Sequence, residues 1–133
     1  MDLRPGIART AQFDVQAVRC RASEAGYATF VLPADGVVDR ESFFHAIRAT
    51  LPLDPPLTGS RSWDAMSDSL WEGLYALPDR QIAILWPNAR LMASAASSDF
   101  QMALNVLTDV VNLLANRRAT NGSPKDVSVV IEY

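Results

Sequence analysis

Three short runs of β-branched, aromatic and aliphatic residues lie far apart in the chain, and segments with helical periodicity separate them. The runs cover residues 27–32, 81–86 and 127–131, and turn-forming residues follow the first two. Runs of this length and composition are typical of strands. Because helical crossovers join neighbouring strands of a parallel sheet, we predict an α/β fold in which a small three-stranded parallel sheet is packed with helices.

The segments between the runs carry helix start signals. Asp39 can cap a helix over residues 40–50, whose apolar residues recur at helical spacing. Ser98 is followed three places later by Gln101, a capping-box pattern that predicts the start of a long helix. Residues 89–97 are mostly small, and we expect them to form a loop.

A further helix is predicted from residue 63, because Ser62 can accept a hydrogen bond from an amide of the first turn. Asp64, Asp68 and Glu72 recur every four residues on one face of this helix. Like charges at that spacing cost a helix about 0.2–0.5 kcal/mol per pair, so this acidic face is either ordinary solvated surface or a site for another molecule. A different face carries an apolar stripe that we assign to the core: Trp63, Met66, Leu70 and Leu74.

Negative charge is concentrated around this helix. Residues 35–79 hold eight acidic residues and three arginines, a net charge of −5, whereas the rest of the chain carries +2. Three prolines in residues 51–59 exclude both a helix and a central strand, and they indicate a stiff extended loop next to the acidic helix.

The stretch from Gly59 to Leu70 resembles the central motif of the barstar family. It has a glycine, a short polar run and then the letters WDAMSDSL. Members of that family inhibit ribonucleases by occupying the active site. The resemblance extends from residue 27 to the C-terminus, since the order of elements also agrees with that family's fold. Residues 1–26 then form a short N-terminal extension, which we expect to contain one short helix or strand.

The resemblance also implies a set of partner-binding residues. Asp68 matches the acid that enters the nuclease active site, and Asp64 matches its neighbour one turn earlier. Leu57 and Thr58 occupy the place of loop aromatics that seal the rim, and Ser67 stands where the best-known member has an aromatic. The complete predicted set is Leu57, Thr58, Gly59, Asp64, Ser67, Asp68 and Glu72.

These departures from the family pattern leave more than one function open. An acid that the family adds from its last helix has no counterpart near Arg117, so the resemblance implies a different nuclease or a non-nuclease partner. The first hypothesis is an inhibitor of a basic ribonuclease or nuclease toxin domain. The second is a non-inhibitory protein–protein interaction module that uses the same acidic face. The third, an enzyme or metal site on the paired acids, is disfavoured because no glycine-rich phosphate loop and no catalytic His or Cys arrangement accompanies them.

Composition limits the remaining possibilities. The 133 residues suit one domain, and we expect no cofactor, no bound metal, no direct nucleic-acid contact and a monomer when free. No run approaches the roughly 18 apolar residues of a membrane span, and no apolar leader is evident, which predicts a cytoplasmic protein. We expect the single cysteine, Cys20, to be a small packed residue and the single histidine, His45, to face solvent.

Overall fold

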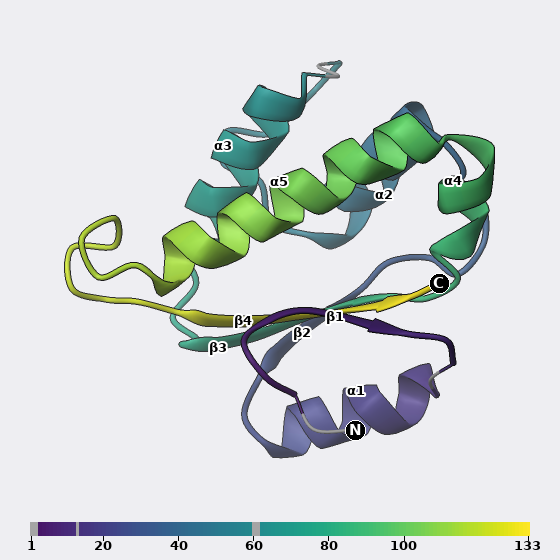
Figure 1. Cartoon of the computed structure of the whole chain (residues 1–133). Coiled ribbons are helices and arrows are strands. Elements are labelled where there is room, and N and C mark those ends of the chain that lie inside the picture. The colour runs from purple at the N-terminus through teal and green to yellow at the C-terminus, as the bar shows by residue number, and fades with distance from the viewer. Residues whose placement is uncertain (1–2, 13, 60–61) are drawn as a thin grey trace.

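The structure is a computed structural model that describes residues 3–12, 14–59 and 62–133. Strands and helices alternate along most of the chain (Figure 1). In chain order the elements are β1 (Gly6–Thr10), α1 (Val15–Glu24), β2 (Ala28–Val31), α2 (Arg40–Thr50), α3 (Trp63–Tyr75), β3 (Gln81–Trp86), α4 (Arg90–Ala95), α5 (Ser97–Ala115) and β4 (Asp126–Glu132).

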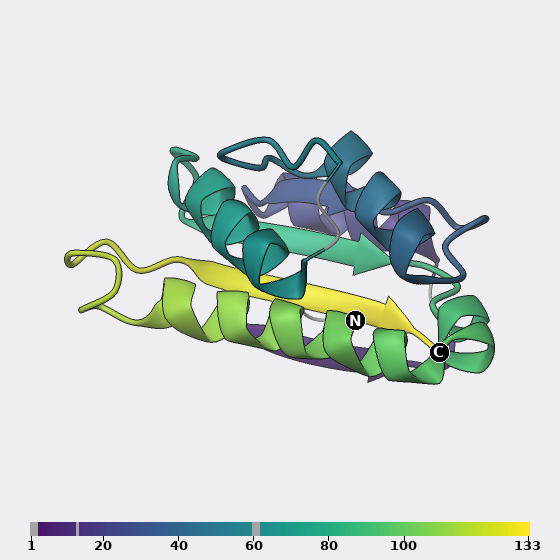
Figure 2. The same ribbon diagram turned by 90° about the horizontal axis from the view of Figure 1, so that it is seen from above.

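The four strands form one parallel sheet in the order β1-β4-β3-β2. Helix α1 lies against one face of this sheet, while α2, α3 and α5 cover the other (Figures 1 and 2). The α/β class and the parallel direction of the strands are therefore confirmed.

The prediction of three strands is wrong, because a fourth strand, β1, comes from the first 26 residues. Residues of β1 pair in parallel with β4, from Gly6 opposite Ser128 to Thr10 opposite Glu132. The three central residues of β1 are exposed, so this edge strand is joined mainly through its backbone and carries no apolar run that would reveal it. The N-terminal segment thus completes the sheet and supplies α1, while its treatment as a separate extension stays a prediction.

The central strands β3 and β4 are buried on both faces, as their continuous apolar runs require. The main core lies between the sheet and helices α2, α3 and α5, and it contains a cluster of aromatic rings: Phe43, Phe44, Trp63, Trp86 and Phe100. On the other face, Val18 of α1 packs with Leu85 and Val130 in a smaller cluster.

The helix predictions held where side chains cap the first turn. The carboxylate of Asp39 accepts a hydrogen bond from the amide of Ser42 at 2.9 Å, and the start of α2 is confirmed. Two predictions were wrong at the other end of the chain. Helix α4 occupies most of the expected loop, and α5 begins at Ser97 without a side-chain cap, so the capping box at Ser98 does not form.

Two other single-residue predictions had opposite outcomes. His45 is exposed on α2, as expected. Cys20 is also exposed, so its assignment to the packed interior was wrong. In α1 the buried positions are Val18 and Ala22, and Cys20 lies between them on the outer side of the helix.

Candidate partner-binding surface

Helix α3 is fixed in place by its apolar stripe. The hydroxyl of Ser62 accepts a hydrogen bond from the amide of Ala65 at 3.3 Å, which confirms the predicted cap. The stripe is buried against the main core, with exposed fractions between 0% and 8% for Trp63, Met66, Leu70 and Leu74. The opposite face of this helix is exposed to solvent, and the buried stripe holds the helix in a fixed position.

The proline-containing loop before α3 is anchored against the helix. The amide of Asp54 donates a hydrogen bond to the carbonyl of Ser69 at 3.0 Å. Gly73 allows the close approach, because a Cβ at this position would overlap the carbonyl oxygen of Pro52. The loop therefore runs along α3 and brings its last residues, Thr58 and Gly59, to the surface near the start of the helix.

One predicted rim residue does not lie on the surface. The side chain of Leu57 is 6% exposed and belongs to the main core, and its carbonyl accepts a hydrogen bond from Arg48 at 3.3 Å. A sealing role for this side chain at the rim is wrong, because the core already holds it. Thr58 and Gly59 are exposed, and the backbone φ of +82° at Gly59 explains why a glycine is found there.

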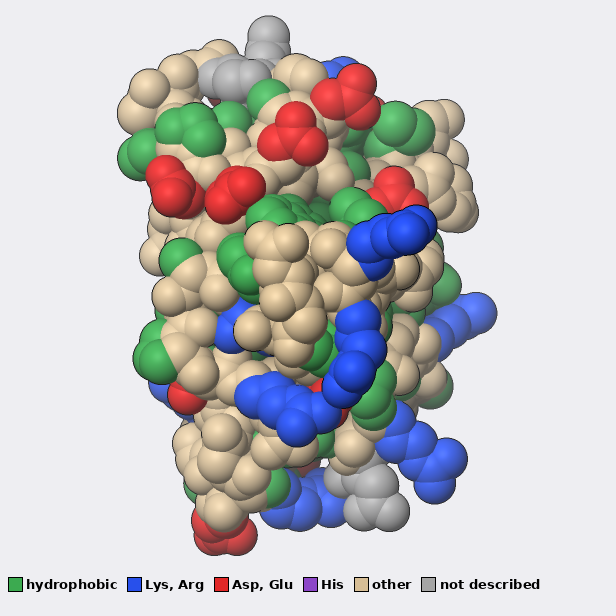
Figure 3. Space-filling view, turned by 90° about the vertical axis from the view of Figure 1, so that its left-hand side faces the viewer, with side chains coloured by type: hydrophobic (Ala, Val, Ile, Leu, Met, Phe, Trp, Pro, Cys, Tyr) green, Lys and Arg blue, Asp and Glu red, His purple; other side chains and the backbone are tan. Residues whose placement is uncertain are grey.

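The three acidic side chains of α3 are exposed, as predicted. Within the described residues, the carboxylates of Asp64, Asp68 and Glu72 have no hydrogen-bond or ion-pair partner. Figure 3 views the end of the molecule that includes α3 and the loop after α5, and Asp and Glu side chains gather over its upper part. Three carboxylates that have no partner in the described part of the chain can bind cationic groups of another molecule.

Two of these acids line a groove between α3 and the C-terminal part of α5. The groove has a volume of about 480 Å³, and its lining includes Ser67, Asp68, Trp71 and Glu72 of α3. Leu113 of α5, whose side chain is 46% exposed, and Ala119 form the facing wall. Asp64 lies outside the groove, one turn earlier on the same helix. The structure thus combines carboxylates with an apolar wall that comes from a distant segment.

Trp71 is the residue in this groove that the sequence analysis missed. Its ring stacks on Tyr75 at 4.8 Å between centroids, and its indole Nε1 is buried without a hydrogen-bond partner among the described residues. The hydroxyl of Tyr75 donates to the carbonyl of Thr120 at 2.8 Å, which fixes this ring pair against the loop after α5. Trp71 lies three residues after Asp68, so a large aromatic on the acidic side of the helix was the signal available.

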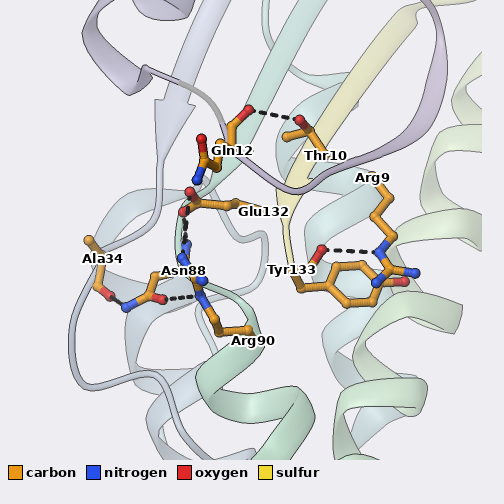
Figure 4. Close-up of polar contacts among 8 residues, drawn as sticks. All are labelled: Arg9, Thr10, Gln12, Ala34, Asn88, Arg90, Glu132 and Tyr133. Carbon is orange, nitrogen blue, oxygen red and sulfur yellow. Dashed lines mark hydrogen bonds and ion pairs between the residues drawn. The ribbon is translucent and has the colours of Figure 1, made fainter.

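A second polar cluster, at the carboxyl ends of the strands, is internally satisfied (Figure 4). Glu132 accepts a hydrogen bond from the amide of Asn88 at 2.7 Å and lies 3.8 Å from the guanidinium of Arg90. The side-chain amide of Asn88, Nδ2, donates a hydrogen bond to the carbonyl of Ala34 at 3.1 Å. Arg9 donates to the carbonyl of Tyr133 at 3.1 Å and lies over its ring. These contacts tie the β3–α4 connection and β1 to the end of β4, so we assign them to the fold.

Among the described residues, no group of three or more His, Cys, Asp or Glu side chains is arranged to hold a metal ion. None of the helices in the described part of the chain is both long and apolar enough to cross a membrane.

The fold and this surface define a small α/β protein that presents an acidic helix face, with two of its acids lining a groove that also has an apolar wall. Residues 27–124 match the family model described as Barstar (barnase inhibitor), and because this is most of the chain, the protein belongs to the barstar family. The family is one of inhibitors rather than enzymes, and its members bind ribonuclease partners. Neither the curated proteins nor the solved structures gave a significant match to this chain.

Proposed function

We propose that the protein inhibits a ribonuclease, in the manner of a toxin immunity protein, by placing the acidic face of α3 in the basic active site of the enzyme. The observation that carries this proposal is the pair Asp68 and Glu72, exposed, unpaired within the described residues and lining one groove. Membership of the barstar family supplies the class of partner.

The chemistry of a ribonuclease explains why carboxylates would block it. Its active site must bind phosphate, so it is lined with Arg, Lys or His side chains that donate hydrogen bonds. A carboxylate accepts the same bonds and offers no bond to cleave. Asp68 is the proposed anchor, and Asp64 and Glu72 guide the approach through their longer-range field. The buried stripe of α3 keeps these groups in position before the partner arrives.

The groove accounts for the parts of the interface that are not acidic. An Arg or Lys of the enzyme has a long apolar stem, which can lie against Trp71 and Leu113 while its charged end reaches Asp68 or Glu72. Thr58, Gly59 and the half-buried Ser67 border the acidic face, and backbone groups at Gly59 can approach the enzyme closely.

The proposed partner is a basic ribonuclease or nuclease toxin domain, and the proposed place of action is the cytoplasm. The protein binds the enzyme directly, without a cofactor and without contact to nucleic acid. It is a monomer when free, and the enzyme covers the acidic face in the complex.

Capture of the partner is the first test. The protein, immobilised, is exposed to lysate and secreted material of the organism that encodes it, and the retained proteins are identified by mass spectrometry. We expect a small basic ribonuclease, whose cleavage of a fluorogenic RNA is blocked by the wild-type protein. The double variant Asp64→Ala/Asp68→Ala should not retain it.

The two acids in the groove should have different effects on binding. We expect Asp68→Ala to weaken binding by about 3 kcal/mol, or more than about a hundredfold in Kd, because it leaves basic groups of the enzyme desolvated and unpaired. Glu72→Gln should mainly slow association at low salt, since it removes long-range attraction. Asp109→Ala is the matched control, because Asp109 is an exposed acid of α5 that does not line the groove.

Surface plasmon resonance at two salt concentrations separates these effects. Small and equal losses for Asp68→Ala, Glu72→Gln and Asp109→Ala would reject the assigned roles. Retention of the same non-nuclease protein by wild type and double variant would reject inhibition by this face and favour an interaction module.

A further inference from the structure

A second cavity lies next to the groove on α3, and its lining carries the opposite charge. Its volume is about 620 Å³, within the range of about 300–1,000 Å³ that is usual for small-molecule sites. Three cationic side chains line it from three separate segments: Arg80 immediately before β3, Arg117 after α5, and Lys125 immediately before β4. In Figure 3, Lys and Arg side chains spread over the middle and lower part of this end of the molecule.

Lys125 is a buried cation that no carboxylate neutralises through an ion pair within the described residues. It is 6% exposed, and its ammonium donates to the carbonyls of Leu77 and Asp79, each at 2.6 Å. An ammonium has three N–H groups, so one is left without a partner in the described part of the chain. Burial lowers the pKa of Lys125, and the charge of Asp79 opposes this shift. The wall of the cavity therefore carries a buried ammonium, one of whose N–H groups has no partner among the described residues.

The two arginines add donors that the fold does not use. Neither Arg80 nor Arg117 has a side-chain hydrogen bond or ion pair within the described residues, and both are exposed. Asp79 and Asp126 line a neighbouring cavity with Arg80 and do not line this one. Both guanidinium groups are therefore available to an anion.

The rest of the lining is largely apolar. Tyr75, Leu77 and Pro124 form walls beside the cationic groups. The amide of Gly122 is already used, because it donates to the carbonyl of Arg117 at 2.7 Å. The charged side chains and the hydroxyl of Ser123 are thus the donors in the lining, and the apolar walls fit an organic group attached to the anion.

We propose that this cavity binds a phosphomonoester that carries an aromatic group, in the size range of a mononucleotide. A phosphomonoester has three terminal oxygens, which matches donors that reach the cavity from three segments. A single carboxylate has two oxygens in one plane, and one arginine is enough to satisfy it. This proposal is independent of ribonuclease inhibition, because it uses none of the acids of α3.

Calorimetric titration of the full chain at low ionic strength and neutral pH tests the proposal, with adenosine monophosphate as the probe. Inorganic phosphate, adenosine and citrate separate the contributions of the phosphate, the aromatic group and carboxylates. We expect adenosine monophosphate to bind more tightly than phosphate and citrate, and adenosine not to bind measurably. Chemical-shift changes should centre on Gly122, Lys125 and Arg80.

Two arginine variants provide a matched comparison. Arg117→Gln should weaken binding of adenosine monophosphate by about tenfold or more, because it removes a charge-assisted donor from the cavity. Arg118→Gln removes the same charge from the next residue, which does not line the cavity, and should change binding by less than about twofold. Both residues are exposed, so both variants should fold.

Three results would overturn the proposal. They are no binding of adenosine monophosphate at millimolar concentration, equal losses in the two arginine variants, and tighter binding of citrate than of adenosine monophosphate. Absence of binding would show that the cavity is not a site for this ligand. Equal losses in the two variants would show general charge attraction, and tighter binding of citrate would show that the cavity prefers carboxylates.

Discussion

Asp39 and Ser42 show how two residues define the start of an element. The hydroxyl of Ser42 lies 2.6 Å from the carboxylate of Asp39, and it also accepts hydrogen bonds from the amides of Val38 and Asp39. These contacts satisfy amides that the first turn of α2 leaves free. The hydrogen bonds that the hydroxyl and the amide of Ser42 donate to the carboxylate lower the pKa of Asp39 below its ordinary value.

This shift has a defined consequence for stability against pH. A carboxyl whose pKa is lower in the folded state contributes stability above its unfolded pKa, and this contribution is lost as the pH falls through the folded value. Ser42→Ala should therefore raise the pKa of Asp39 towards 3.8 and make the unfolding free energy less dependent on pH below about pH 4. NMR titration of the Asp39 carboxyl carbon measures the pKa, and urea unfolding at several pH values measures the pH dependence of the unfolding free energy. Ser62→Ala, which removes the cap of α3 instead, should leave the pKa of Asp39 unchanged, and an equal rise in both variants would contradict the explanation.

The packing of the proline loop against α3 determines how a substitution at Gly73 changes the stability of the protein. In most exposed helix interiors, replacing glycine by alanine stabilises by about 1 kcal/mol. At Gly73 we expect the opposite, a loss of about 1–3 kcal/mol, because the new Cβ would overlap the backbone of Pro52 and the loop would have to move. Urea unfolding measures the change, and Glu72→Ala at the exposed preceding position is the control. A more stable Gly73→Ala protein would show that the loop is not held against the helix.

Elements with apolar periodicity were predictable, and those held by backbone contacts were not. Strands β3 and β4 and helices α2, α3 and α5 each bury a regular set of apolar residues, and Ala28 and Phe30 of β2 are half-buried against the same core. Helix α4 buries one residue within its span, Met92, and Ala96 ends α4 and immediately precedes α5, which places Ser98 inside the first turn. No side-chain pattern marks either feature.

The candidate site also has one part that could be predicted from the sequence and one part that could not. The acidic face was predictable because a helix places residues four apart on one side. The groove was not predictable, because β3, α4 and most of α5 separate Leu113 and Ala119 from α3 in the sequence. Only the tertiary fold brings these residues together. The burial of Leu57 likewise depends on its contact with the core rather than on its neighbours in sequence.

At the scale of the whole molecule, α3 contributes to two cavities of opposite charge. Trp71 lines the acidic groove and Tyr75 lines the basic cavity, and the two rings are stacked on each other. Both cavities are lined by residues of α3 and of α5 or the loop that follows it. Helices α3 and α5 lie on one side of the sheet, whereas α1 covers the other side (Figure 1). Helix α1 therefore supports the sheet from the face opposite the proposed nuclease surface, and β1 extends the sheet beside β4.

Removal of residues 1–26 should consequently lower stability without removing the partner-binding surface. It would expose the edge of β4 that pairs with β1 and the apolar face formed by Leu85 and Val130. We expect the free energy of unfolding to fall by about 3 kcal/mol or more, and the shortened protein to self-associate through the open edge. Urea unfolding and sedimentation velocity measure these effects, and the fraction that stays folded and monomeric should still block the ribonuclease. A shortened protein as stable and monomeric as the full chain would instead show that residues 27–133 form an independent domain, in which β4 tolerates an open edge.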